Sequence, residues 1–313
     1  MRILVVGAGA IGGYFGGRLL QAQRDVTFLV RGPRAAQLRA TGLVIRSPLG
    51  DAELRGPPTI QAEVLRQPYD LILLSCKAYD LESAIRSFAP AIGPGSAVLP
   101  LLNGMRHLDV LERRFGAAAV LGGECVISAA LDAQGGILHL NDLHTLTFGE
   151  RTAASSARSE AIRAELAAAS FETRLSPAIE HEMWEKWILI AALAGITCLM
   201  RASIGDIAAA DAAPLAAELY MECARIAAEA GFAPSESMRQ RSLGALTTPD
   251  SPLTASMLRD IESRGRTEVE QILGDLLRRG SSDATQSLSR SLLAIAYAHV
   301  RAYENRRQSE LSN

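Results

Sequence analysis

A glycine-rich turn directly follows the first hydrophobic segment of the chain. The chain opens with MRILVVGAGAIGG, in which Ile3 to Val6 is a continuous apolar run. Such a run is typical of a strand in a parallel sheet that is covered on both faces. Residues 7–12, GAGAIG, match G-x-G-x-x-G, residues 14–21 predict a helix, and residues 25–30 predict a second strand. The glycine pattern therefore lies inside a βαβ unit, where it predicts a dinucleotide-binding fold.

Each glycine of this turn has a distinct role in such a fold. The first, Gly7, permits the tight turn, Gly9 lets the backbone approach a pyrophosphate, and Gly12 lets the helix pack closely on the strand. The N-terminus of the helix adds unpaired N–H groups and a positive dipole end. The residues expected to hold the pyrophosphate are Gly7, Gly9, Ala10, Ile11 and Gly12.

The residue after the second strand indicates which dinucleotide is bound. NAD enzymes usually place an acidic residue there, whereas this chain has Arg31. A guanidinium binds a 2′-phosphate bidentately, so Arg31 favours NADPH over NADH; the alternative is a solvated loop arginine. A second candidate phosphate contact, Lys77, follows the strand-like residues 70–76, at the edge where parallel sheets bind ligands.

The hydrophobic patterns predict two domains. Strand-like segments at 97–102 and 119–129 alternate with helix-like segments at 80–92 and 107–115, which predicts a doubly wound parallel sheet, and 135–150 suggests a β hairpin or meander. Beyond residue 178 only helical periodicity remains. The helices are expected at 178–200, 213–230, 234–243, 254–263, 267–279 and 285–307. We expect a Rossmann-type NADP-binding domain over 1–174 and an all-α domain over 175–313.

Composition excludes several classes of protein. The formal net charge of −2 argues against binding to nucleic acid or to an anionic membrane. The longest apolar run, 187–200, has 14 residues, whereas a membrane span needs about 20. The four cysteines form no CxxC pair and the histidines show no metal-ligand spacing, so we expect free thiols, no metal site and a cytoplasmic location.

Several short motifs together resemble one enzyme family. GAGAIGG, Arg31, CKAYD (76–80), NGM (103–105), WEKW (184–187) and SMLRDIESRGRTEVE (256–270) occur in order. The combination resembles ketopantoate reductase, the 2-dehydropantoate 2-reductase family, and covers nearly the whole chain. The resemblance implies NADPH-dependent reduction of a 2-oxo acid. It places the catalytic lysine at Lys186, its paired glutamate at Glu268, the asparagine beside nicotinamide and substrate at Asn103, the substrate-carboxylate serine at Ser256, and the 2′-phosphate contacts at Arg31 and Lys77.

The chemistry of ketone reduction independently favours a lysine at position 186. The developing alkoxide needs a proton donor, and a lysine desolvated by apolar neighbours gives up its proton more readily. Arginine cannot do so near neutral pH. Of the 32 basic residues that are Lys or Arg, only Lys77 and Lys186 are lysines. The alternative for Lys186 is an i,i+4 ion pair with Glu182 on a solvated helix face. Thr267 to Glu270 has capping-box spacing, which predicts Glu268 in the first turn of a helix.

Two positions depart from the family pattern. The family has asparagines four and eight residues after the catalytic lysine, where this chain has Ile190 and Ala194. If these residues line the substrate pocket, a less polar 2-oxo acid or ketone becomes an alternative substrate to ketopantoate. A non-catalytic NADP(H) sensor is a third alternative, although a sensor needs no proton donor. A homodimer is compatible with all three.

Overall fold

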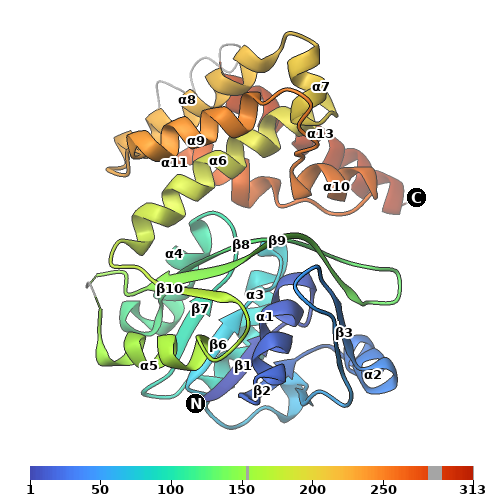
Figure 1. The fold of residues 1–313 in the computed structure, drawn as a ribbon, viewed down its shortest axis with the longest axis vertical. Coiled ribbons are helices and arrows are strands. Elements are labelled where there is room, and N and C mark those ends of the chain that lie inside the picture. The colour runs from blue at the N-terminus through green and yellow to red at the C-terminus, as the bar shows by residue number, and fades with distance from the viewer. Residues whose placement is uncertain (153–154, 281–290, 313) are drawn as a thin grey trace. The chain divides into compact units, whose positions relative to one another are not determined.

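The computed structural model describes residues 1–152, 155–280 and 291–312, and Figure 1 shows the course of the chain. The chain divides into two compact units. The first comprises Met1–Leu102 and His107–Glu180, and the second comprises Asn103–Arg106 and His181–Asn313. The first unit thus extends beyond the 174/175 boundary that we expected, and the loop at Asn103 belongs to the second unit.

The first unit contains a five-stranded parallel sheet. Its strands are β1 (Arg2–Val6), β2 (Asp25–Leu29), β5 (Thr59–Ile60), β6 (Leu71–Leu74) and β7 (Ala97–Pro100). Their order is β5-β2-β1-β6-β7, and all neighbouring pairs are parallel. The central β1 therefore has β2 on one side and β6 on the other, which confirms the doubly wound sheet.

A second, mixed sheet completes this unit. Its strands are β3 (Leu43–Arg46), β4 (Ala52–Leu54), β8 (Gly122–Leu131), β9 (Ile137–Gly149) and β10 (Glu172–Leu175). The order is β10-β9-β3-β4, with β8 antiparallel to β9. We expected residues 119–129 in the parallel sheet, but only Val120 forms a parallel bridge there, with Val98 of β7, and β8 belongs to the second sheet. The hairpin reverses at 132–136, where Asp132 accepts hydrogen bonds from the amides of Gln134 and Gly136, so residues 137–149 form one strand instead of a complete hairpin.

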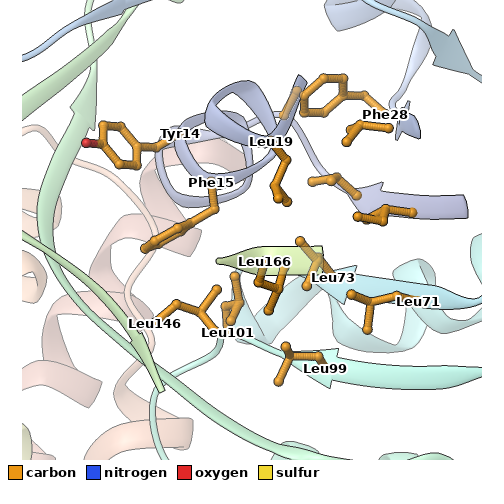
Figure 2. Close-up of a cluster of buried hydrophobic side chains, with 14 of the residues drawn as sticks. Tyr14, Phe15, Leu19, Phe28, Leu71, Leu73, Leu99, Leu101, Leu146 and Leu166 are labelled. Carbon is orange, nitrogen blue, oxygen red and sulfur yellow. The ribbon is translucent and has the colours of Figure 1, made fainter. Parts of the chain in front are cut away.

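Helix α1 (Ala10–Gln21) packs on both sheets through its small residues. A Cβ at Gly16 would lie 2.7 Å from the Phe28 ring, and one at Gly17 would lie 2.8 Å from Leu43. Glycine at these positions lets the helix approach both sheets closely. Phe15 and Leu19 extend from the helix into the buried cluster that also contains leucines of β6, β7 and β9 (Figure 2).

The remaining helices of the first unit connect the strands. They are α2 (Gly32–Thr41), α3 (Leu81–Phe88), α4 (Arg106–Phe115, whose first residue belongs to the second unit) and α5 (Ala157–Leu166). Single 3-10 turns occur at Ala62–Val64, Ala78–Asp80, Ala89–Ala91 and Ala117–Ala119.

The second unit is helical, and its described residues contain no strand. Its elements are α6 (Ile179–Met200, beginning in the first unit), α7 (Ile204–Ala209), α8 (Ala213–Glu229), α9 (Glu236–Thr247), α10 (Ser256–Glu262), a π-helical segment (Glu270–Gly274), α11 (Asp275–Arg279) and α13 (Leu292–Ser312). Residues 285–290 of the helix predicted at 285–307 lie outside the described residues. Helix α6 is long and apolar enough to cross a membrane, but 67% of its most apolar window is buried in the protein, as in the core helix of a folded unit.

Buried carboxylates join helices of this unit that are distant in sequence. On α6, Glu185 accepts hydrogen bonds from the amide (2.7 Å) and hydroxyl (2.6 Å) of Ser235, which caps α9. On α13, Glu304 accepts from the amide (2.5 Å) and hydroxyl (2.7 Å) of Thr267. Hydrogen bonds to an ionised acceptor are stronger than neutral ones, so these contacts fix the segments that they join.

Candidate active site

The glycine turn after β1 is packed tightly on one side. The Ser75 hydroxyl, just beyond β6, lies within hydrogen-bond distance of the carbonyl oxygens of Val6 (3.1 Å) and Gly7 (3.2 Å). A Cβ at Gly12 would lie 2.0 Å from the Ser75 hydroxyl and 2.3 Å from the Gly7 carbonyl. Gly7 itself has φ +95°, a conformation that favours glycine. The first and third glycines of the motif are therefore required by the fold of this turn.

Gly9 differs from these two glycines because it borders open space. A Cβ built on it meets no atom within 4 Å. Helix α1 begins at the next residue without a side-chain cap and without an acidic residue in its first turn. The amides at this helix end and the space beside Gly9 are suited to the pyrophosphate of a dinucleotide. The residues of this turn thus fit the pyrophosphate of a dinucleotide cofactor.

The two predicted phosphate contacts follow strands on either side of β1. Arg31 follows β2, is 71% exposed and lies 3.3 Å from the Asp80 carboxylate. Lys77 follows β6 and precedes the 3-10 turn that ends at Asp80, whose amide donates to the Lys77 carbonyl at 2.9 Å. The ion pair therefore brings Arg31 to the turn that begins after Lys77, at the same edge of the sheet as the glycine turn.

Arg34 is a residue of this region that the sequence analysis missed. Its Nε donates to the carbonyl of Ala8 (3.0 Å), and another guanidinium nitrogen donates to the carbonyl of Gly135 (2.8 Å). Burial lowers the pKa of Arg34, while the nearby Asp132 opposes this shift. Arg34 thereby ties the glycine turn to the β8–β9 hairpin. Nothing in the sequence distinguishes it from the other arginines.

The predicted catalytic residues all lie in the second unit. Lys186, on α6, is partly buried. The next residue, Trp187, donates from its indole nitrogen to the carbonyl of Ile272 at 3.0 Å. Ile272 belongs to the π-helical segment, so this hydrogen bond joins the segment to α6 directly beside Lys186.

Glu268 lies immediately before this helical segment. Its carbonyl accepts hydrogen bonds from the amides of Gln271 (3.0 Å) and Ile272 (2.9 Å). The predicted capping box between Thr267 and Glu270 is wrong. The Thr267 amide and hydroxyl donate to Glu304 instead. The Glu270 carboxylate accepts from the hydroxyl of Tyr297 and pairs with arginines of α11 and α13. These long-range partners outcompete the local cap. Glu268 precedes the first turn instead of lying within it.

The loop that carries Asn103 contacts the same segment. The Gln271 side chain donates to the Asn103 carbonyl at 2.9 Å. Ser256 is exposed at the start of α10. The amide of the residue before it, Ala255, donates to the Thr197 hydroxyl of α6 at 3.4 Å. Helix α6 therefore anchors the segment that follows Glu268 and the one that carries Ser256.

The two apolar positions on α6 have different environments. Ile190 is partly exposed, whereas Ala194 is 1% exposed. Ile190 keeps part of its side-chain surface exposed, whereas Ala194 is covered by its neighbours. The predicted roles of both residues in substrate binding stay predictions.

This fold and these residues define a class: a two-unit protein with a Rossmann-type dinucleotide-binding unit and a helical unit that carries a lysine, a glutamate and an asparagine. Residues 3–153 match the family described as ketopantoate reductase PanE/ApbA, and residues 178–304 match its C-terminal domain. The chain belongs to the ketopantoate reductase family, as its motifs predicted. It is an oxidoreductase of the NAD(P)-dependent type that acts on CH–OH groups.

Individual relatives cover nearly the whole chain. It is 37% identical to the uncharacterized oxidoreductase YkpB of Bacillus subtilis, over 97% of this chain and 99% of that protein. It is 28% identical to a 2-dehydropantoate 2-reductase of Halobacterium salinarum, over 89% and 92%. A D-mandelate dehydrogenase solved with NADH and anilino(oxo)acetate has the same fold, with a TM-score of 0.86, 20% identity, and coverage of 98% of this chain and 100% of that chain.

Proposed function

We propose that this protein reduces a 2-oxo acid with NADPH and that ketopantoate, the precursor of pantoate in pantothenate biosynthesis, is its substrate. The observation that carries the proposal is the hydrogen bonding within the second unit. The Trp187–Ile272 bond joins the helix of Lys186 to the segment after Glu268, and the Gln271–Asn103 bond joins that segment to the Asn103 loop. We place the reaction in the cytoplasm.

The side chains have distinct tasks in this reaction. The bound nicotinamide supplies the hydride that the keto carbon accepts. Lys186 donates a proton to the keto oxygen, and the proton donor must be positioned before charge develops there. Glu268 orients the substrate hydroxyl and Lys186, Asn103 orients the keto acid, and the Ser256 hydroxyl binds its carboxylate.

The preference for NADPH is assigned to Arg31 and Lys77. The fold also accommodates NADH, as in the D-mandelate dehydrogenase complex, so the fold does not decide between the cofactors. A charge-assisted contact to a phosphate contributes about 1.5–3 kcal/mol, or roughly 10- to 100-fold in affinity. NADPH should bind more tightly than NADH by that factor, and Arg31→Asp should abolish the difference. Equal dissociation constants in the wild type would contradict this assignment.

A panel of 2-oxo acids, followed through the absorbance of the nicotinamide, tests the reaction. Lys186→Met should lower kcat by about 10²–10⁴, the range for general acid catalysis, with NADPH binding nearly unchanged. Lys186→Arg should also be poor, because it keeps the charge without a proton that can be transferred. An arginine variant with wild-type turnover would show that Lys186 acts only as a charge. A panel without turnover would refute the assignment of a 2-oxo acid as the substrate.

A second candidate substrate is a less polar 2-oxo acid or ketone. It is favoured by Ile190, which is partly exposed one helical turn beyond Lys186. An isoleucine offers no hydrogen bond to a substrate hydroxyl. The same panel separates the two candidates when it includes analogues that lack the hydroxyl of ketopantoate.

A further inference from the structure

The side chain of Gln271 connects two parts of the chain that carry candidate catalytic residues. It is 5% exposed, and its amide nitrogen lies 2.9 Å from the carbonyl oxygen of Asn103. Its main-chain amide donates to the carbonyl of Glu268 at 3.0 Å. Through these two contacts Gln271 is bound to the backbone of both Asn103 and Glu268.

The packing around Gln271 leaves little freedom for the Asn103 loop. Gly104 has φ +82°, and a Cβ on it would lie 3.0 Å from the Gln271 carbonyl and 3.2 Å from its side-chain nitrogen. The glycine therefore lets the loop rest directly on Gln271. Because the loop touches the residue that binds it, loss of the side-chain hydrogen bond would change the position of the Asn103 backbone.

The backbone at Gln271 is itself unusual. Residues Glu270–Gly274 are π-helical, and such single turns are rare inside helices and frequent at functional sites. The indole of Trp187 holds the next residue, Ile272, through its carbonyl. The segment is thus fixed to α6 on one side and to the Asn103 loop on the other, with Gln271 as the link to the loop.

We propose that Gln271 is a positioning residue that sets the place of the Asn103 carboxamide relative to Glu268. The inference rests on the proposed function, because it assumes that Asn103 orients the substrate. A displacement of a reacting or orienting group by about 1 Å can cost roughly 100-fold in rate. Gln271 therefore contributes to turnover without touching the substrate.

The first test replaces Gln271 by methionine, which keeps the length of the side chain and removes its donor. Gln271→Met should lower kcat/KM for the 2-oxo acid by about 10- to 100-fold, mainly through kcat. The dissociation constant for NADPH should change by less than about twofold, since the glycine turn, Arg31 and Lys77 are untouched. All rates are measured at a temperature at which every variant is folded.

Ser291→Ala is the matched control for stability. The Ser291 hydroxyl accepts from Ala294 N at 3.0 Å at the start of α13 and donates to the Glu222 carboxylate, in the same unit. Loss of the cap alone costs about 0.5–2 kcal/mol. Ser291→Ala should lower the melting temperature while leaving kcat/KM within about twofold of the wild type. An equal loss of kcat/KM in both variants would assign the effect of Gln271→Met to stability and overturn the inference.

A double-mutant cycle tests whether Gln271 acts through Asn103. Residues that act as a unit show non-additive effects. Gln271→Met should therefore lower kcat/KM by less than about twofold in an Asn103→Ala background. Wild-type turnover in Gln271→Met, beside a loss in Asn103→Ala, would overturn this inference alone. Wild-type turnover in Asn103→Ala would overturn the assigned role of Asn103 and this inference with it.

Gln271→Glu is a second variant of nearly the same shape, and it keeps the test valid if the methionine variant does not fold. A carboxyl group donates a hydrogen bond only when protonated. Turnover of Gln271→Glu relative to the wild type should therefore be highest at low pH and fall as the carboxyl ionises. A ratio that is constant with pH would contradict a role for the donated hydrogen bond.

Discussion

Replacement of Trp187 by phenylalanine isolates the hydrogen bond that holds the segment after Glu268 to α6. Trp187 is 1% exposed, and its indole nitrogen lies 3.0 Å from the Ile272 carbonyl. Phenylalanine keeps most of the aromatic packing but has no N–H donor. The variant therefore leaves a buried carbonyl without this partner, which costs about 1–3 kcal/mol.

Trp184→Phe is the matched control for this variant. Trp184 is 2% exposed, lies on the same helix, and its ring centroid is 4.9 Å from that of Trp187. The described part of the chain shows no hydrogen bond from its indole, so its replacement removes the same atoms without breaking a comparable bond. The cost of the smaller ring is similar for both variants and largely cancels in the difference between them.

The assay is urea unfolding followed by tryptophan fluorescence. Both tryptophans of the protein lie in the second unit, so each variant keeps one reporter of that unit. With a urea dependence of about 2 kcal/mol per molar, the midpoint for Trp187→Phe should lie about 0.5–1.5 M below that for Trp184→Phe. Equal midpoints would show that the Trp187–Ile272 bond contributes nothing to the stability of the unit.

Three further predictions concern charge, pH and substrate. Asp80→Asn removes the carboxylate that lies 3.3 Å from Arg31 and competes with a phosphate for its guanidinium. Because exposed ion pairs contribute about 0–1 kcal/mol, NADPH affinity should rise by up to about fivefold while NADH affinity stays unchanged. An equal rise for both cofactors would contradict this. Burial, and then the nearby charges of His139 and Arg18, lower the pKa of His144 in the folded state. Below about pH 6.5 the unfolded state therefore binds more protons than the folded state. As the pH is lowered in that range, the free energy of unfolding should fall by at most about 1.4 kcal/mol per pH unit. His144→Gln should reduce that slope in unfolding experiments at pH 5 to 7, and an unchanged slope would exclude His144 as its source. In the wild type, kcat/KM for ketopantoate should exceed that for 2-oxo-3,3-dimethylbutanoate by less than about tenfold, and a preference of a hundredfold would show that another residue binds the hydroxyl.

Local patterns in the sequence were sufficient to predict the core of the first unit. The β1–α1–β2 unit is encoded within the first 30 residues by an apolar strand, a glycine turn and a helix. The second sheet was mostly missed because β3, β4 and β10 are three or four residues long. Such short strands depend on their partners and leave little periodic signal.

The contacts that hold the candidate site are less visible in the sequence than the residues themselves. Lys186 is predicted by its rarity and its apolar neighbours, and Gly7 to Gly12 by their spacing. Gln271 and Asn103 are 168 residues apart, and their bond depends on a backbone carbonyl that any residue possesses. The capping box at Thr267 was wrong for the same reason, because Glu304 competes for Thr267 from a distant helix. A pattern within one segment cannot reveal a partner in another.

The burial of Ala194 changes what can be expected from restoring the family's two asparagines. An asparagine at 190 would present its amide at a partly exposed position one turn beyond Lys186, so Ile190→Asn should raise the preference for ketopantoate over its deoxy analogue with little loss of stability. An asparagine at 194 would enter a position that is 1% exposed. An amide buried there without a partner costs about 1–3 kcal/mol. Ala194→Asn should therefore lower the urea midpoint and leave the substrate preference unchanged. If Ala194→Asn instead raised the preference as much as Ile190→Asn, residue 194 would have to become uncovered when the substrate binds.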